Sequence, residues 1–586
     1  MKNNLTLSSH KESLINNCCN IFLDERTLAE VEKKNFDYIV SDSILFDNKD
    51  RLLSFNECDK IYKSILSDLY LKLNDIHNIE WTKRSWEILI GFWLRKFIYI
   101  IFFKFNTLKA ILNQKNIDRV CLSETKTGYL ASHEATAIED LSIDNDWSWI
   151  LYSKIFKYLD TNKIEIKTFI NEKENFYEIK TLYEKLGKNI SFKNKIVKGY
   201  TYLSKKFMSK SSNFIAATYL PILEEKKLQL LFGQIPNFYS PPKINYSPIS
   251  LNLRKKLLID KDCFGVEKIT RDLISYYLPT FALENFQLLR TTVEKHSYPK
   301  KPKFIFTSNL FESDEAFKFY LANIKSLNNP PKYFVGQHGN SYFTKIDNNY
   351  SNEMVTCDYF VSWGKKNHKD KKIINLFNLK LPKKTTKKNL DKIVIVFRSL
   401  GYQTLPYDRW KEGKNEFLMV KKFLKYFDVN FRKNIHLRLH SSFKNRYKKF
   451  VQNYLLNIQD YEKDFGEISY KKVINQAELV IFTYDSTGFL ENLISGKPSI
   501  CLYPNIFNHL NEDCNKYYKD LIDAKIIFDD PKEMYIHIKS IWPNVNTWWN
   551  SPKIQNEINN FSKTFSASAT KNPVSLIKKK IIEKLI

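Results

Sequence analysis

The stretch AELVIFTYDSTGFLENLISGKPSICLYP, residues 477–504, determines the fold that we expect. Its apolar run ELVIFTY is typical of a parallel strand that is covered on both faces. A helix follows, with Phe489 and Leu490 on its buried stripe. Gly496 and Pro498 end that helix before a second apolar run, SICLY. The stretch therefore predicts a right-handed βαβ unit.

The same alternation continues on both sides of this unit. Strands are predicted at KIVIVF and IHLRLH, with the helix EFLMVKKFLKYF between them, and further strands near residues 120, 305, 335 and 360. Residues 68–105 and 147–186 are predicted to be largely helical. The expected fold class is α/β and GT-B-like, with two Rossmann-like lobes and a helical amino-terminal elaboration.

The lysine- and threonine-rich tract around residue 385 cannot build a core and predicts a linker between the two lobes. The predicted boundaries are 1–380 for the acceptor-side amino-terminal lobe, 381–391 for the linker, 392–542 for the nucleotide-sugar-binding lobe, and 543–586 for terminal helices that pack across the lobes.

The composition excludes several classes of protein. The net charge of +28 suits an anionic partner, but lysine is over-used along with asparagine and isoleucine, and no nucleic-acid-reading motif accompanies the charge. We therefore expect no specific nucleic-acid partner. The eight cysteines show no zinc-type spacing, and the first residues lack a secretory signal, so a cytoplasmic protein with reduced thiols is expected.

The most apolar stretch is residues 86–105, WEILIGFWLRKFIYIIFFKF. Charged residues within it, including Arg95 and Lys104, favour a buried or interfacial helix over a membrane span. Peripheral contact with the inner face of a membrane through its basic and aromatic residues stays open.

The turn DSTGFLEN lies where a strand passes into a helix. Main-chain N–H groups converge at a helix N-terminus, together with hydroxyls, so the turn is a candidate phosphate site formed by Asp485, Ser486 and Thr487. Glu491, one turn later, could accept ribose hydroxyls. The structural alternative is that the hydroxyls only cap the helix.

In NIHLRLHSS, strand alternation places Arg438 and His440 on one face. The guanidinium of Arg438 suits phosphate, and His440 can donate a hydrogen bond to a leaving group. Alternatively, this strand face is simply solvated.

The segment VGQHGNSYF places Gln337, His338 and Gly339 at a strand end in the amino-terminal lobe. Gly339 allows close approach of the backbone to a ligand, and His338 is a candidate for positioning or proton transfer. If the reaction inverts, a carboxylate of this lobe is the base. Of the carboxylates after predicted strands, including Glu312 and Glu315, we take Glu124 and Asp314 as candidates, with helix capping as the alternative for Asp314.

No metal site is predicted. Asp144 and Asp146 of DNDW match a loose Asp-x-Asp pattern, but they precede the helical WSWILYSKIF and are read as a helix cap. The chain has neither a Walker loop nor a GxGxxG fingerprint, so P-loop hydrolysis and dinucleotide redox chemistry are excluded.

Together, KFIFTSNLFESDEAFKFYLA, VGQHGNSYF, CDYFVSWG, RLH and YDSTGFLENLISGKP resemble a bacterial transferase family of surface-polysaccharide gene clusters. More distantly, the chain resembles GT-B transferases that use CMP-activated acidic sugars, such as Kdo and sialyl transferases. That likeness implies nucleotide and phosphate binding by His440, Ser486 and Thr487. Two departures are Asn340, where the family usually has glycine, and Ser441, where proline is expected after the histidine.

The resemblance implies a glycosyltransferase that moves a sugar from a nucleotide donor to a surface-polysaccharide or lipid-linked acceptor. The nucleotide sugar is a co-substrate, no further cofactor is expected, and basic groups would replace a metal. Two alternatives stay open: a CDP-polyol phosphotransferase of teichoic-acid type, and a basic binding or scaffold protein on the same fold.

Overall fold

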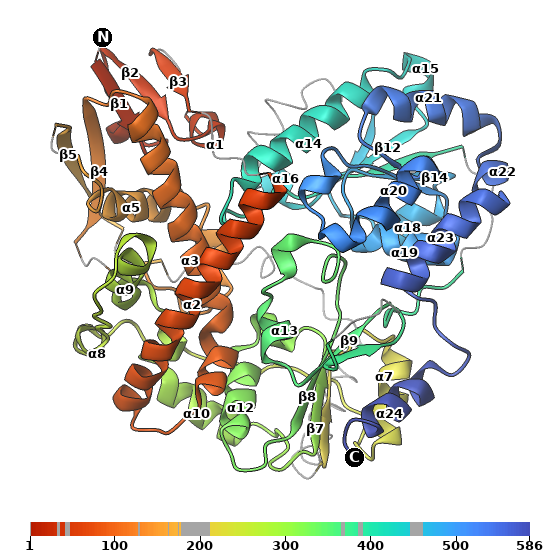
Figure 1. Cartoon of the computed structure of the whole chain (residues 1–586), viewed down its shortest axis with the longest axis horizontal. Coiled ribbons are helices and arrows are strands. Elements are labelled where there is room, and N and C mark those ends of the chain that lie inside the picture. The colour runs from red at the N-terminus through yellow and green to blue at the C-terminus, as the bar shows by residue number, and fades with distance from the viewer. Residues whose placement is uncertain are drawn as a thin grey trace.

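The computed structural model describes residues 2–31, 36–41, 47–126, 129–161, 163–173, 175–176, 211–364, 370–384, 391–445 and 461–586. Within them the chain forms three parallel β-sheets (Figure 1). We call the part built on the first two sheets the N lobe and the part built on the third sheet the C lobe. The six predicted linker residues 385–390 lie outside the described residues.

The first sheet occupies the amino-terminal region, where the sequence predicted helical segments and one strand, near residue 120, which is β4. Its strand order is β3-β2-β1-β4-β5, with the bounds β1 Lys2–Thr6, β2 Cys18–Phe22, β3 Tyr38–Val40, β4 Arg119–Thr125 and β5 Glu165–Asn171. The predicted helix over 147–186 is correct for α5 (Asn145–Phe156) and wrong for β5, and its part at residues 177–186 lies outside the described residues. The amino-terminal elaboration is thus an α/β unit. Asp144 caps α5 by accepting from the N–H of Trp147, as predicted.

Two long helices, α2 (Asn48–His77) and α3 (Lys83–Gln114), lie between the first sheet and the second (Figure 1). The apolar stretch predicted to be buried or interfacial lies in α3, where most of its side chains are buried in a core shared with both sheets. Arg95 pairs with Asp59 at 2.8 Å, and the ammonium of Lys104 donates to Ser148 at 2.6 Å. No described helix is long and apolar enough to cross a membrane.

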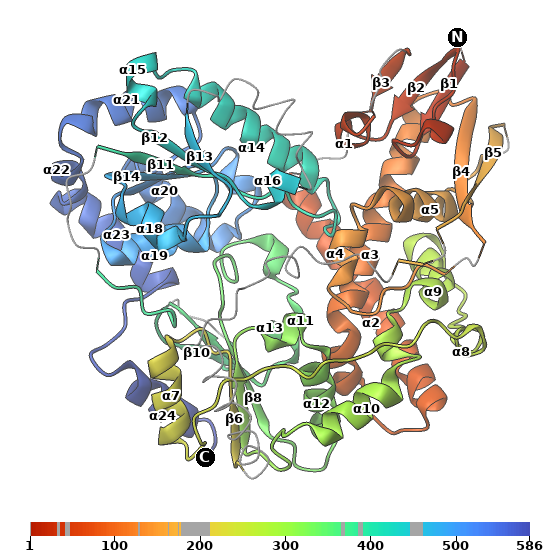
Figure 2. The ribbon, with the colours of Figure 1, turned by 180° about the vertical axis from the view of Figure 1, so that it is seen from behind.

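The second sheet has the order β10-β9-β8-β7-β6. Its strands are β6 Asn213–Ile215, β7 Phe304–Thr307, β8 Lys332–Gly336, β9 Tyr359–Ser362 and β10 Ile373–Asn375. One face contributes to the core shared with α3 and α12 (Glu315–Lys325). The other face is covered by α7 (Ile222–Leu231) and α24 (Pro573–Ile582), which lie side by side in Figures 1 and 2.

The third sheet contains the predicted βαβ unit of residues 477–504. Its order is β13-β12-β11-β14-β15-β16, with the bounds β11 Ile393–Val396, β12 Ile435–Arg438, β13 Glu462–Asp464, β14 Leu479–Phe482, β15 Ser499–Leu502 and β16 Ile527–Phe528. Separate apolar clusters cover its two faces, as expected for parallel strands. The chain order reverses between β11 and β14, so the topological switch point lies there.

The remaining α-helices surround these sheets. In the N lobe they are α1 Glu25–Ala29, α4 Ala137–Leu141, α8 Leu251–Lys256, α9 Gly265–Tyr277, α10 Phe286–Lys295, α11 Leu310–Ser313 and α13 Asn352–Thr356. In the C lobe they are α14 Arg409–Leu424, α15 Val429–Arg432, α16 Ser442–Asn445, α18 Tyr470–Asn475, α19 Thr487–Ser495, α20 Asn515–Asp523 and α21 Pro531–Ile541.

The carboxyl-terminal helices α22 (Val545–Trp549), α23 (Pro552–Phe565) and α24 connect the lobes. α23 contacts α19 and α20 of the C lobe, whereas α24 contacts α7 of the N lobe. At the crossing, a Cβ on Gly364 would lie 1.8 Å from the carbonyl oxygen of Thr564, so only glycine fits there. With two Rossmann-like lobes, the architecture is the GT-B-like α/β fold expected from the sequence.

Candidate functional site

The QHG segment leaves the carboxyl end of β8 and forms a loop that is fixed from within the N lobe. The side chain of Gln337 accepts from the N–H of Trp363 at 2.8 Å and donates to the carbonyl of Gly339 at 2.8 Å. Ser341 has a φ of 80°, a conformation that side-chain-bearing residues rarely adopt. Gln337 therefore stabilises the loop rather than binding a ligand. Ser341, the residue with the strained backbone, lies at the interface between the N lobe and the C lobe, which we call the seam.

His338 lies in this loop against aromatic side chains. The hydroxyl of Tyr342 is 2.7 Å from its Nδ1, and a hydrogen bond to the main chain of Ser308 also engages the ring. Burial and the nearby Lys380 lower the pKa of His338 to about 4, so the ring is neutral at neutral pH. This geometry favours a role for His338 in positioning a ligand over a role in proton transfer.

A cavity of about 230 Å³ lies beside the loop. Its lining comes from α3, α4, α11, the QHG loop and residues 347–353, and includes Lys96, Glu139, Glu312, His338, Asn340 and Glu353. At about 30 Å³ per water it holds several waters, and it is smaller than the cavities that enclose whole drug-sized ligands. It could enclose one sugar ring, but a complete nucleotide sugar would extend beyond it.

Glu312 differs from the other acids of this cavity. Glu353 is buried and accepts from the hydroxyl of Tyr342 at 2.6 Å, whereas the carboxylate of Glu312 has no hydrogen-bond or ion-pair partner among the described residues. Burial raises the pKa of the Glu312 carboxyl, and the charges of Lys96 and Lys318 oppose that shift. An unpartnered carboxylate with a raised pKa is suited to accept a proton from a bound hydroxyl.

The carboxylates predicted to be the base lie elsewhere. Asp314 caps α12 by accepting from the N–H of Phe317 at 2.9 Å, and its other oxygen accepts from the hydroxyl of Tyr239. Glu124 ends β4 in the first sheet, where it forms a surface ion pair with Lys157. Neither lines the cavity around His338. The sequence analysis named Glu312 among the carboxylates after predicted strands but did not select it, and the fold is what distinguishes it.

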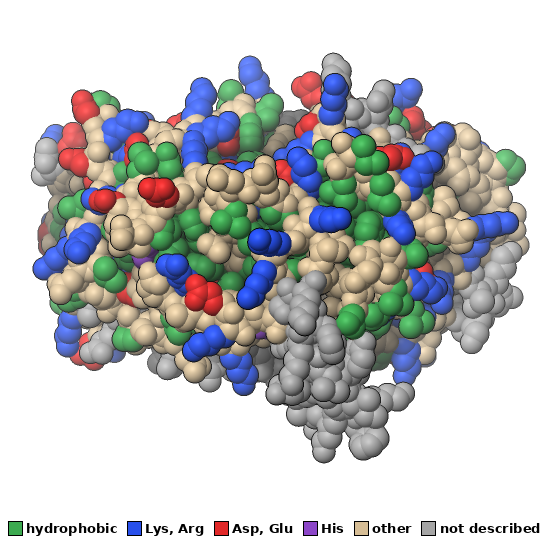
Figure 3. Space-filling view, turned by 90° about the horizontal axis from the view of Figure 1, so that it is seen from below, with side chains coloured by type: hydrophobic (Ala, Val, Ile, Leu, Met, Phe, Trp, Pro, Cys, Tyr) green, Lys and Arg blue, Asp and Glu red, His purple; other side chains and the backbone are tan. Residues whose placement is uncertain are grey.

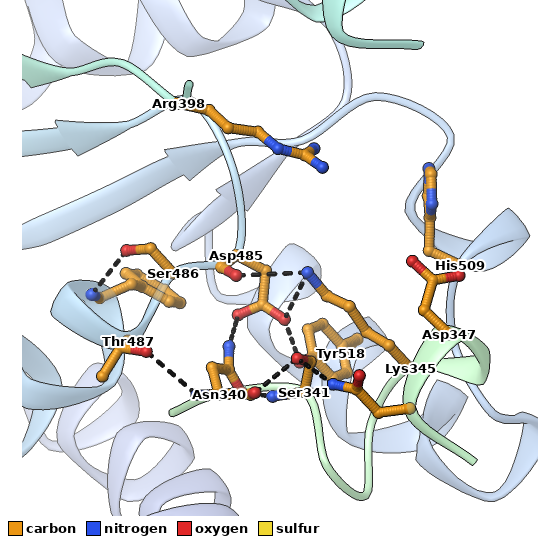
Figure 4. A network of polar contacts seen from close by, with 12 residues as sticks. Asn340, Ser341, Lys345, Asp347, Arg398, Asp485, Ser486, Thr487, His509 and Tyr518 are labelled. Carbon is orange, nitrogen blue, oxygen red and sulfur yellow. Dashed lines mark hydrogen bonds and ion pairs between the residues drawn. The ribbon is translucent and has the colours of Figure 1, made fainter. Parts of the chain in front are cut away.

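The Asp485 turn ends β14 and meets the QHG loop directly (Figure 4). Asp485 accepts from the side-chain amide of Asn340 and from the hydroxyl of Tyr518 at 2.7 Å, and the ammonium of Lys345 lies 3.8 Å away. The N–H of Asn340 donates to the hydroxyl of Thr487 at 3.0 Å. Asn340 and Lys345 belong to the N lobe, so this turn joins the lobes.

Ser486 and Glu491 are also bonded within the protein. The hydroxyl of Ser486 accepts from the N–H of Phe489 at 3.1 Å and caps α19. Glu491 pairs with Lys380 of the N lobe at 2.8 Å. Donor binding by these residues stays a prediction, and for Asp485, Thr487 and Glu491 it requires the seam contacts to open.

Arg438 and His440 lie at the end of β12, two strands away from the Asp485 turn. Arg438 pairs with Asp464 at 2.7 Å and donates to the carbonyl of Ile468, while Asp464 also bonds His436 at 2.7 Å. His440 is exposed, and its Nδ1 lies 2.8 Å from the hydroxyl of Ser442. Of the predicted donor residues, His440 is the one that is exposed.

The switch point of the third sheet carries a residue that the sequence analysis did not select. Arg398 follows β11, and its guanidinium pairs with both carboxylate oxygens of Glu416 at 2.7 and 2.9 Å. Its main-chain N–H donates to Thr483 at the end of β14. An arginine directly after a predicted strand is the signal that could have identified it.

A second polar contact joins α2 of the N lobe to the C lobe. Arg51 pairs with Glu412 of α14 and lies 3.0 Å from Nδ1 of His509, and its guanidinium stacks on Tyr407. Burial and the charge of Arg51 lower the pKa of His509 to about 3. Buried charges that are paired in this way fix the relative position of the lobes.

The carboxyl edges of two parallel sheets therefore meet across a polar seam, with a small cavity on one side and a switch point on the other. This arrangement defines a two-lobed, GT-B-like enzyme. The chain belongs to the LIC12162 family of transferases, whose model matches residues 4–581.

Several solved structures are similar to this chain at low sequence identity and low TM-score. The match to TarM has 12% identity and a TM-score of 0.30, and it covers 48% of this chain and 54% of TarM, or about half of each. MurG of Acinetobacter baumannii has 13% identity, a TM-score of 0.29, and coverage of 50% and 77%. The UDP-GlcNAc 2-epimerase of Neisseria meningitidis has 11% identity, a TM-score of 0.33, and coverage of 79% and 100%. No curated protein matches the sequence.

Proposed function

We propose that this transferase moves a glycosyl group from a nucleotide sugar to a hydroxyl of a surface-polysaccharide or lipid-linked acceptor. The observation that supports this is Glu312, an unpartnered carboxylate in a cavity that could enclose one sugar ring, at the carboxyl edge of the second sheet. That edge faces the switch point of the third sheet, where Rossmann-like folds bind nucleotides.

In the proposed reaction, Glu312 accepts the proton of the acceptor hydroxyl. The acceptor oxygen then bonds to the anomeric carbon of the donor, and the bond from that carbon to the phosphate oxygen breaks. Negative charge develops on the departing phosphate. His440, Arg438 and the N-terminus of α19 are the donors proposed to stabilise it.

The donor is proposed to lie on the C lobe, because the cavity beside Glu312 is too small for a whole nucleotide sugar. Entry of the donor then requires the contacts between Asn340 and the Asp485 turn to separate. The acidic CMP-activated sugar remains the donor that we propose first.

The test is a thermal-shift screen with CMP, CDP, UDP, GDP and their sugars, including UDP-GlcNAc and CMP-sialic acid. A true donor present at a hundred times its Kd stabilises the folded protein by about 2.7 kcal/mol. We expect one nucleotide to raise Tm in the wild type and to raise it less in His440→Ala. Lys425→Ala, which changes an exposed cation at the far end of α14, is the control.

Product analysis then separates the proposal from its alternatives. Release of free nucleotide together with a glycosylated acceptor supports glycosyl transfer. Release of CMP from a CDP-polyol, with the polyol phosphate on the acceptor, would establish the phosphotransferase instead. A wild type that no nucleotide stabilises would contradict the proposal and favour the binding protein.

A further inference from the structure

The helices α7 and α24 form the outer layer over one face of the second sheet. Leu228 of α7 and Val574, Ile577 and Ile581 of α24 pack inward against the strands. Gln229 of α7 donates to the carbonyl of Ile215 in β6 at 2.8 Å. The inner faces of both helices thus pack against the sheet, and their outer faces point away from it.

α7 exposes apolar side chains at both of its ends. Ile222 and Leu223 at its start are 64% and 74% exposed, and Leu230 and Leu231 at its end are 61% and 42% exposed. Single exposed apolar residues are ordinary on a protein surface, but four on one helix of ten residues form a patch. Such patches mark surfaces that contact a partner or a membrane.

The charge around this patch is predominantly positive. A groove of about 690 Å³ runs between α7 and the start of α24, with Leu230, Leu231 and Leu381 among its lining and Lys227, Lys383 and Lys571 beside them. Lys227 pairs with Glu224, whereas Lys383 and Lys571 have no ion pair among the described residues. Figure 3 shows the molecule from below. In its right half, the side on which α7 and α24 lie in Figure 1, hydrophobic side chains stand among lysines and arginines.

We propose that the α7–α24 layer, meaning the outer faces of these two helices and the groove between them, binds an anionic membrane surface. Leucine and isoleucine side chains that emerge among unpaired lysines combine the two interactions that hold a protein on such a membrane. α3 contains the stretch for which the sequence left contact with a membrane open. Most of its side chains are buried, so it cannot supply this contact. The inference does not depend on the proposed function.

Vesicle flotation of the full chain tests the surface. We expect binding to vesicles of phosphatidylcholine with phosphatidylglycerol, little binding to phosphatidylcholine alone, and a loss of binding as salt screens the lysines. Leu223→Gln and Leu230→Gln should each lower the partition coefficient roughly tenfold. Lys383→Gln and Lys571→Gln should each lower it roughly fivefold.

The controls are Phe264→Gln and Lys425→Gln, which change an exposed apolar residue and an exposed cation outside the layer. Phe264 is 86% exposed at the start of α9. Equal binding to neutral vesicles, no binding to either vesicle, or equal losses in the control and patch variants would overturn the proposal. A dimer seen by light scattering and abolished by the patch variants, without vesicle binding, would assign the layer to a second copy instead.

Discussion

The two sides of the seam differ in how their acidic side chains are satisfied. In the C lobe, Asp485 accepts from Asn340 and Tyr518 and lies beside Lys345. In the N lobe, Glu312 lines a cavity without any such partner among the described residues. A buried acid whose oxygens are bonded, such as Asp485, stabilises the architecture, whereas a half-buried acid without such partners, such as Glu312, is expected where chemistry needs it. We therefore expect Asp485 to hold the two lobes together and Glu312 to take part in the reaction.

The largest expected effect is on activity. Glu312→Gln keeps the shape of the side chain but removes its basicity, so we expect kcat to fall by roughly 10²–10⁴-fold with little change in Tm. The measurement is the initial rate of product formation at saturating donor. Glu124→Gln, which removes the surface ion pair with Lys157, is the control and should keep full activity. Full activity of Glu312→Gln would show that the carboxylate is not the base.

The second effect is on stability. Asp485→Ala leaves Lys345, Tyr518 and Asn340 without their shared acceptor in a buried place, so we expect the free energy of unfolding to fall by about 3–5 kcal/mol. Urea unfolding measures it. Asp428→Ala removes an exposed helix cap of α15 and should cost only about 1 kcal/mol. If the two variants lose the same amount, Asp485 is not an anchor between the lobes.

The sequence predicted the centre of the C-lobe sheet because β11, β14 and β15 are apolar on both faces, β12 alternates apolar and polar residues, and the helices are amphipathic. β13, with the sequence EKD, has no such pattern. The predicted KIVIVF, IHLRLH and ELVIFTY correspond to β11, β12 and β14. Of the first sheet, the sequence predicted only β4, near residue 120. β1 and β2 were missed because their interior is partly polar: Asn4 of β1 and Asn20 of β2 are buried and bond each other at 2.8 Å. A pattern search that counts apolar residues cannot detect such strands.

The site could be predicted only in part, for a different reason. The QHG loop and the Asp485 turn were located because glycine and a helix cap leave local signals. Whether a given hydroxyl or carboxylate is free depends on neighbours far along the chain: Asn340 reaches Thr487, and Lys380 reaches Glu491. Glu312 and Asp314 are nearly adjacent in sequence, yet one lines a cavity and the other caps α12.

The third effect depends on pH. His338 and His509 lie near the seam with pKa values lowered to about 4 and about 3, while in the unfolded chain a histidine titrates near 6.5. Below pH 6.5 these two histidines are therefore protonated in the unfolded chain but stay neutral in the folded chain. The free energy of unfolding consequently falls as the pH falls toward 4. For His338 the free energy of unfolding lost over this pH range is of the order of 3 kcal/mol.

Urea unfolding of the wild type and of His338→Gln from pH 7 to about pH 4.5 tests this dependence. In the variant we expect a slope that is smaller by about 1.4 kcal/mol per pH unit in the middle of that window, because one fewer proton is taken up on unfolding. His440→Gln, which changes an exposed histidine, is the control. An unchanged slope in His338→Gln would mean that its ring is protonated in the folded protein.

The smallest effect concerns Ser486, for which the sequence left two roles open. Ser486→Ala removes the cap of α19 and should lower the free energy of unfolding by about 1 kcal/mol. Asparagine and aspartate cap helices as well as serine does, so Ser486→Asn and Ser486→Asp should restore stability. Only Ser486→Asp places a negative charge where a phosphate of the donor would bind. If nucleotide-induced stabilisation is weaker in Ser486→Asp than in Ser486→Asn, the hydroxyl lies at the donor phosphate; if the two variants match, Ser486 is a cap alone.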